Sequence, residues 1–150
     1  MALKNQTKLL FAEKLEEMLE SMTLEQVRIV ELCKRAGTIS QTFYYHFRDK
    51  YELVAWTFLY DFSLVFGDQR PDYSKNKIIE SLKQIEKRRI FYLKTYTDQS
   101  QNSINRYMQN FNVQTAITAV KYSRGGEELT ETEINKIKYY SYGMMGLFSE

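Results

Sequence analysis

The chain has 150 residues, about the length of one domain, and 43% of them are hydrophobic and 15% aromatic. With one proline and six glycines, this composition excludes a disordered chain and favours a mainly helical fold. One cysteine, Cys33, excludes an internal disulfide, and a net charge of +2 does not by itself indicate a nucleic-acid-binding protein.

The charges are unevenly distributed along the chain. Residues 34–50 hold four basic side chains against Asp49 alone, whereas residues 127–150 are acidic. The first twenty residues carry charges every few positions, so they hold neither a signal-peptide core nor a span of about 20 apolar residues. Together with the lone thiol, this pattern is typical of a cytoplasmic protein without membrane contact.

Two helices are predicted before the first glycine. Leu3 to Glu20 has apolar residues three and four apart, which predicts a helix with one buried face. Thr23 and Gln26 have the spacing of a capping box, so we expect a second helix to follow and to end before Gly37. Its expected buried face consists of Val27, Val30 and either Leu32 or Cys33.

A short helix and a longer one are expected after the Gly37 turn. Thr38 or Ser40 is the predicted cap of the short helix, which covers about residues 41–47. Phe43 and Phe47 are four residues apart and should face inward, which leaves the two tyrosines between them outside. Asp49 is the predicted N-cap of the longer helix, which runs towards Gly67.

The rest of the chain also has helical periodicity. Residues 67–74 are predicted to form a loop, followed by helices over about 74–96 and 103–122. After Gly125-Gly126, Thr130 and Glu133 form a second capping box that opens the last helix. No strand pattern competes, so the predicted fold class is all-α, with an N-terminal three-helix helix-turn-helix domain joined to a C-terminal helical bundle.

Three short helices before a longer one, with a glycine turn between the second and third, form the arrangement of a helix-turn-helix module. The residues here are Ala36-Gly37, then Gln41-Thr42-Phe43-Tyr44-Tyr45-His46-Phe47, then Asp49-Lys50 and Leu53. They resemble the N-terminal signature of the TetR family of transcription regulators, and the run from Gln41 to Phe47 most resembles its DhaS-like subgroup. The resemblance covers about residues 10–59.

This resemblance implies a recognition helix at about Ser40 to His46 that lies in the major groove of DNA and is presented by a helix from about Arg28 to Arg35. Glutamine pairs bidentately with adenine, and hydroxyl groups reach base edges or phosphates. Lys50 matches the phosphate-contacting lysine of the family. The DNA-binding residues expected on this basis are Arg28, Thr38, Ser40, Gln41, Thr42, Tyr44, Tyr45, His46 and Lys50.

Four residues depart from the family pattern, one of which is Thr38, where the family tends to carry valine. Ile39 replaces the small polar cap of the recognition helix, Arg28 stands where relatives commonly carry a capping threonine, and Ser40 stands where close relatives often carry a basic residue. These departures motivate an alternative function, a helical protein-interaction adaptor with a degenerate DNA-binding head. An enzyme is not expected, because one histidine, one cysteine and no phosphate-binding loop or metal-spaced cluster leave no catalytic, cofactor or metal site.

Residues 1–50 are therefore expected to form the DNA-binding domain, and residues 51–150 an effector-binding and dimerisation domain. Operator DNA, a second copy of the chain and a small-molecule or protein effector are the expected partners. Gly143 and Gly146 permit a close helix approach, either within the chain or across a dimer axis. Aromatic residues and methionines at helical spacing are more often plain core, yet such residues are our candidates for an effector pocket. These candidates are Tyr96, Tyr107, Met108 and Phe111.

Overall fold

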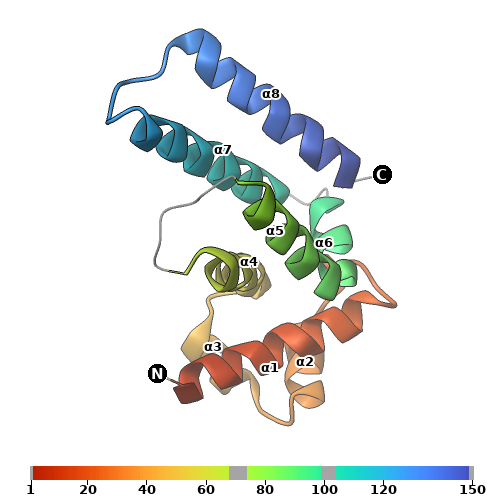
Figure 1. The fold of residues 1–150 in the computed structure, drawn as a ribbon. Helices are drawn as coiled ribbons and strands as arrows, with labels where there is room; N and C mark the ends of the chain where they lie inside the picture. Colours follow the sequence, from red (N-terminus) through yellow and green to blue (C-terminus); the bar gives the residue numbers. More distant parts are fainter. Residues whose placement is uncertain (1, 68–73, 99–103, 149–150) are drawn as a thin grey trace.

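A computed structural model describes residues 2–67, 74–98 and 104–148, and in these ranges the chain forms eight helices and no strand (Figure 1). The prediction of an all-α fold is therefore confirmed. The helices are α1 (Ala2–Leu19), α2 (Ile29–Arg35), α3 (Ser40–His46), α4 (Lys50–Phe66), α5 (Lys75–Lys87), α6 (Arg89–Tyr96), α7 (Ile104–Ser123) and α8 (Glu131–Phe148).

The helices are arranged along one axis of the molecule. Helices α1, α2 and α3 form one end, α4 crosses the middle, and α7 and α8 lie side by side at the other end (Figure 1). Both α4 and α6 pack on α1, and both also pack on α7. One hydrophobic core therefore runs from Phe11 in α1 through Phe43 and Phe91 to Met108 in α7.

Several local signals produced the predicted helix ends. The Asp49 side chain accepts a hydrogen bond from the Glu52 backbone N–H at 2.9 Å and opens α4, and Gly67, at φ +60°, ends this helix. At the start of α8, the Thr130 backbone N–H donates to the Glu133 carboxylate at 2.8 Å, and the Glu133 N–H donates to the Thr130 hydroxyl at 3.3 Å. Both capping predictions are confirmed.

The start of the second helix and one residue of its buried face, Val30, were predicted wrongly. Thr23 and Gln26 do make the reciprocal bonds of a capping box, but these bonds close a turn, and α2 begins only at Ile29. Val27 is buried before the helix starts, and Leu32 and Cys33 are both buried within it. Val30 is 60% exposed, because it lies off the face of α2 that buries Leu32 and Cys33.

Two further helix boundaries differ from the prediction. Neither Thr38 nor Ser40 caps α3, because Ile39 occupies the N-cap position and makes no side-chain cap bond. The helix predicted over residues 74–96 is broken at Arg88, whose backbone (φ −117°, ψ 41°) ends α5 and starts α6. The Arg88 side chain binds Asp61 of α4, a contact that the local sequence pattern does not reveal.

Parts of two predictions lie outside the described residues, namely the loop at 68–73 and the start of the helix predicted at Ser103. Ser74 is the N-cap of α5, where its hydroxyl accepts from the Lys77 N–H at 3.4 Å. Within the described ranges, no helix combines the length and the apolar character needed to cross a bilayer.

Candidate functional site

The turn between α2 and α3 is built by hydrogen bonds of the backbone. The Thr38 N–H donates to the Cys33 carbonyl at 2.9 Å, and the Gly37 N–H donates to the Lys34 carbonyl at 3.1 Å. Gly37 has φ +70°, a left-handed conformation that favours glycine. This pair of bonds is a Schellman motif, which ends α2 abruptly and sets the direction in which α3 starts.

Helix α3 has one buried face and one exposed face. Phe43 is 0% exposed, and its ring meets that of Phe11 edge to face with 5.3 Å between centroids. Tyr44 and Tyr45 are 57% and 73% exposed, and Gln41 is exposed beside them. The inward phenylalanine and the outward tyrosines were predicted from the spacing. The helix therefore presents a polar and aromatic side to solvent while a phenylalanine anchors it in the core.

The other predicted DNA-binding residues of α3 and of the turn are less exposed. Thr38, Ser40, Thr42 and His46 are all half-buried. The Ser40 hydroxyl hydrogen-bonds to the Cys33 sulfur, so it ties α3 to α2; burial raises the pKa of the Cys33 thiol, which is the largest effect on it. Burial lowers the pKa of His46, and the charges of Lys8 and Lys4 lower it further.

Lys50 is engaged with the backbone of the preceding loop. Its Nζ donates to the carbonyl oxygens of Glu25 at 2.8 Å and Val27 at 3.0 Å. Burial lowers the pKa of Lys50, whereas Asp98 and Glu25 raise it. Lys50 thus holds the loop before α2 against the start of α4. Arg28, at the end of that loop, is exposed and close enough to lower the pKa of Lys50 slightly.

Two lysines of α1, which the sequence analysis did not select, lie beside the exposed face of α3. Lys4 Nζ is 5.8 Å from the centroid of the Tyr45 ring, and Lys8 Nζ is 5.6 Å from that of Phe47. Both distances are those of cation–π contacts. A signal was present in the sequence, because the two lysines are four residues apart and no acidic residue precedes Glu13.

A cavity of about 240 Å³ lies in the bundle between α4, α5, α6, α7 and α8. Of the four candidate effector residues, one, Tyr96, is among the described residues that line this cavity. Met108 is 0% exposed and belongs to the core, and Tyr107 is 42% exposed at the surface. Phe111 packs edge to face on the rings of Phe58 and Phe62. These two rings line the cavity, so Phe111 supports its wall from behind.

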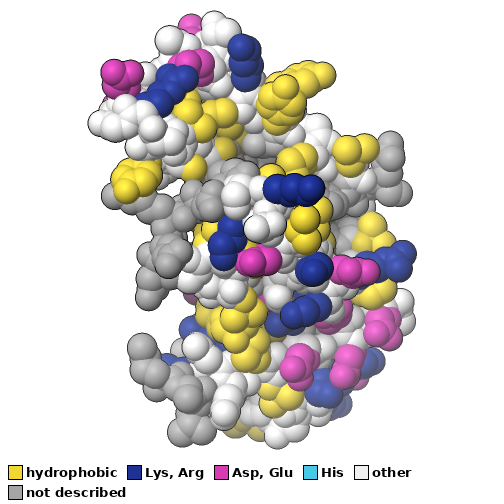
Figure 2. All heavy atoms as spheres, viewed as in Figure 1, with side chains coloured by type: hydrophobic (Ala, Val, Ile, Leu, Met, Phe, Trp, Pro, Cys, Tyr) yellow, Lys and Arg dark blue, Asp and Glu magenta, His cyan; other side chains and the backbone are white. Residues whose placement is uncertain are grey.

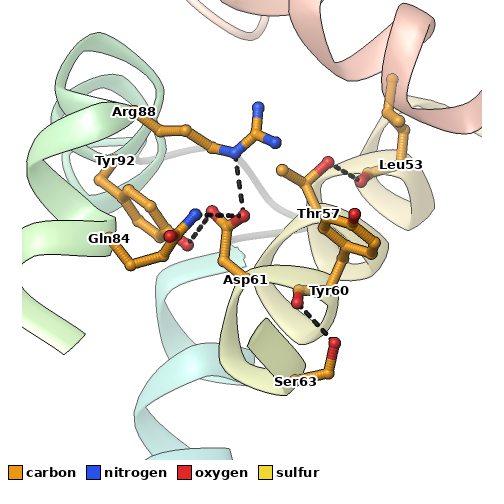
Figure 3. A network of polar contacts seen from close by, with 8 residues as sticks. All are labelled: Leu53, Thr57, Tyr60, Asp61, Ser63, Gln84, Arg88 and Tyr92. Carbon is orange, nitrogen blue, oxygen red and sulfur yellow. Dashed lines mark hydrogen bonds and ion pairs between the residues drawn. The ribbon is translucent and has the colours of Figure 1, made fainter. Parts of the chain in front are cut away.

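A polar network forms part of the cavity wall (Figure 3). Asp61 is 2% exposed and accepts three hydrogen bonds, from Gln84 Nε2 at 3.1 Å, Arg88 Nε at 2.9 Å and the Tyr92 hydroxyl at 2.8 Å. Burial is the main reason why the pKa of Tyr92 is raised, followed by the charge of Asp61. This network was not predicted, although Asp61, the one charged residue within the stretch 53–66, was a signal for it.

The described residues contain no group of three or more His, Cys, Asp or Glu side chains placed to hold a metal ion. Gly143 and Gly146 make no close helix contact within the described part of the chain, since a Cβ at either position would meet no atom within 4 Å.

Comparisons with known proteins lead to transcription regulators. No family model matches the sequence. Over 91 residues, 60% of this chain, the sequence is 26% identical to the HTH-type dhaKLM operon transcriptional activator DhaS of Lactococcus lactis subsp. lactis (strain IL1403). The match spans about half, 49%, of that relative. The fold is similar to a solved structure of a dihydroxyacetone kinase operon activator DhaS, with a TM-score of 0.65 and 18% identity, over 95% of this chain and 82% of that one.

Proposed function

We propose that this chain is a sequence-specific DNA-binding transcription regulator of the TetR type, which binds a pseudo-palindromic operator as a homodimer under the control of an effector. Residues 1–50 act as its DNA-binding domain and residues 51–150 as its effector-binding and dimerisation domain. The sequence similarity to a transcriptional activator supports the regulatory role, and the structural similarity to a solved operon activator supports the fold.

The observation that carries this proposal is the exposed face of α3. Gln41, Tyr44 and Tyr45 stand in solvent on a helix whose opposite side is fixed by a fully buried phenylalanine. A helix presented in this way fits the major groove, where glutamine pairs with adenine and tyrosine hydroxyls reach phosphates. Thr42 lies at the edge of this face, so its methyl group is available to a thymine methyl.

Basic side chains within residues 1–50 supply the contacts to the phosphate backbone. Arg28 and Lys4 are exposed, and Lys8 is half-buried against aromatic rings. Each ion pair with a phosphate releases counterions, so these residues strengthen binding to any sequence and make it sensitive to salt. Lys50 contributes by holding the loop that carries Arg28, and its partly exposed ammonium group lies at the N-terminus of α4.

The surface of α8 supports the homodimer. Tyr139, Tyr140 and Leu147 are 76%, 70% and 71% exposed, more apolar surface than a solvated helix usually presents. Gly143 lies between them with open space around it, which allows the backbone of a partner helix to approach closely. To bind successive major grooves, the two α3 helices of such a dimer have to lie about 34 Å apart, one turn of DNA.

Helix α6 provides a physical connection between the cavity and the head. Tyr92 and Tyr96 line the cavity, whereas Phe91 is fully buried in the core that α6 shares with α1. Glu16 of α1 accepts a hydrogen bond from the Phe91 backbone N–H, and burial raises the pKa of this carboxyl. An effector that moves α6 therefore moves α1. The chain would then have a DNA-binding conformation and a second one that does not bind DNA. The effector can change the affinity for DNA only by as much as its own affinity differs between these two conformations.

The test is a fluorescence anisotropy titration of duplex DNA from the region upstream of the chain's own gene, at several salt concentrations. We expect the logarithm of the association constant to fall linearly with the logarithm of the salt concentration. Gln41→Ala should weaken binding to the preferred site by about 5-fold to 150-fold, because a bidentate base contact contributes about 1–3 kcal/mol. Gln114→Ala is the matched control, since Gln114 is exposed on α7, remote in sequence from the head. Absence of salt-dependent binding would refute the proposal.

One surface feature favours the adaptor function as the second candidate. Ile39 and Val30 are 64% and 60% exposed on the head, where a DNA-binding surface is usually polar. An adaptor would bind a protein partner through this apolar pair. In that case Ile39→Ser would abolish partner binding, whereas Gln41→Ala would change nothing.

A further inference from the structure

We propose that the bundle cavity binds an uncharged, ring-containing small molecule that carries one hydrogen-bond donor, and that this donor binds the Asp61 carboxylate. This inference rests on the proposed function, because it gives the chemical class of the effector. It goes beyond that function by fixing the ligand's size, its charge and the protein atom that it contacts.

The size of the ligand follows from the volume and the wall of the cavity. Its volume is about 240 Å³. An apolar cavity of about 150 Å³ in a protein holds a benzene molecule, so this one has room for a substituted or fused pair of rings. Most of the wall is apolar, with aromatic rings from Phe58, Phe62 and Phe66 and aliphatic side chains such as Val65 and Ile85. Such a wall favours a flat, apolar ligand.

The charge of the ligand follows from the charges at the wall. Asp61 is the sole charged residue among the described lining residues, and the Arg88 guanidinium, 2.9 Å from it, neutralises it. Arg88 itself does not line the cavity. An anion would therefore face carboxylate oxygens, and a cation would lose its hydration to reach a carboxylate that is already paired. An uncharged molecule avoids both the repulsion and the loss of ionic hydration.

The single donor follows from the acceptor capacity of Asp61. An ionised carboxylate has about four lone-pair positions. Among the described residues, Oδ1 accepts from Gln84 and Arg88, and Oδ2 accepts from Tyr92 alone. Figure 3 shows that these donors converge on Asp61 from α5, from Arg88 between α5 and α6, and from α6. Room for one more donor remains at Oδ2, and a ligand hydroxyl is a suitable group.

Apolar side chains reach the surface near the cavity. Ile78, Leu82 and Met144 line it and are each 40–50% exposed. On the face shown in Figure 2, apolar side chains come to the surface around α5 and α8, with acidic and basic side chains between them, and further charged side chains gather over the region of α1 below. An apolar ring can therefore enter from solvent without passing a charged side chain of the lining.

Isothermal titration calorimetry with four naphthalene derivatives tests this inference on the whole chain without DNA. We expect 1-naphthol to bind at least about ten times more tightly than 1-methoxynaphthalene, which has the same rings and no donor. The anion 1-naphthoate and the cation 1-naphthylmethylammonium should show no binding. Equal affinities for the first two compounds, tighter binding of either ion, or no binding of 1-naphthol would each overturn the inference.

Two variants locate the binding within the structure. Ala116→Phe fills the cavity and should abolish 1-naphthol binding, and Ala119→Phe on the same helix is the matched control, because Ala119 does not line the cavity. Tyr92→Phe removes the donor at Oδ2, so the preference for 1-naphthol over 1-methoxynaphthalene should increase. Unchanged binding by Ala116→Phe, or an unchanged preference in Tyr92→Phe, would contradict the assignment. A chain that fails to bind operator DNA can still pass this test, so the two proposals fail separately.

Discussion

Replacing Arg88 by methionine should destabilise the fold strongly, because it leaves a buried charge without its partner. Asp61 is 2% exposed, and the Arg88 side chain that binds it at 2.9 Å is 14% exposed. Removal of one partner of a buried ion pair costs about 3–5 kcal/mol. Two neutral donors, Gln84 and Tyr92, still bind Asp61 after the substitution, so we expect the lower value, about 3 kcal/mol.

Thermal and urea unfolding, followed by circular dichroism, measure this loss. For a chain of this length, about 1 kcal/mol corresponds to about 2–4 °C in Tm, so Arg88→Met should lower Tm by about 6–12 °C. Lys14→Met is the matched control. Its ion pair with Glu17, at 3.0 Å, has side chains that are 27% and 51% exposed, and such pairs contribute less than about 1 kcal/mol.

A second variant separates the charge from the shape of the arginine. In Asp61→Asn combined with Arg88→Met, no charge remains buried, so part of the lost stability should return. The reasoning is refuted if Arg88→Met costs no more than Lys14→Met. It is also refuted if the two substitutions are additive, that is, if adding Asp61→Asn to Arg88→Met lowers the stability as much as Asp61→Asn does alone.

Three further predictions concern local features. Gly37→Ala should reduce the free energy of unfolding by about 1–2 kcal/mol, because its φ of +70° strains any residue that has a Cβ; an unchanged midpoint in a urea titration would contradict this. Asp49→Ala should cost about 1 kcal/mol in the same assay, since it removes the side-chain acceptor at the start of α4, and an unchanged midpoint would contradict this role. The hydrogen bond from Arg124 lowers the pKa of Glu133 to about 2, so the stabilisation by this pair is present above the ordinary pKa of a glutamate and is lost as the pH falls towards 2; an NMR titration should show this low pKa, and its persistence in Arg124→Ala would disprove the cause.

Local sequence patterns sufficed where a helix end or a buried face depends on neighbouring residues. Asp49 and Gly67 marked both ends of α4, because a cap acts on backbone groups within one turn of it. The four-residue spacing of Phe43 and Phe47 correctly predicted which side of α3 is buried. The exposed tyrosines of the candidate DNA-binding face followed from the same spacing.

Local patterns failed where a contact between distant residues overrides them. No glycine or proline marks residue 88, yet α5 ends there while the Arg88 side chain binds Asp61, 27 residues earlier in the chain. Similarly, the capping box of Thr23 formed, but the helix behind it started five residues after Leu24, at Ile29. The local sequence therefore predicted the capping-box hydrogen bonds correctly but placed the start of α2 too early.

The sequence alone determined the helical class, most helix ends and the exposed face of α3, because these depend on hydrophobic periodicity and on capping within a few residues. The tertiary structure decided the cavity, the position of the two α1 lysines beside α3, and the bond between Asp61 and Tyr92, which are 31 residues apart. The physical reason is that burial and charge pairing depend on which helices pack together. The periodicity of a sequence predicts that one face of a helix is buried, but it does not predict which other helix covers that face.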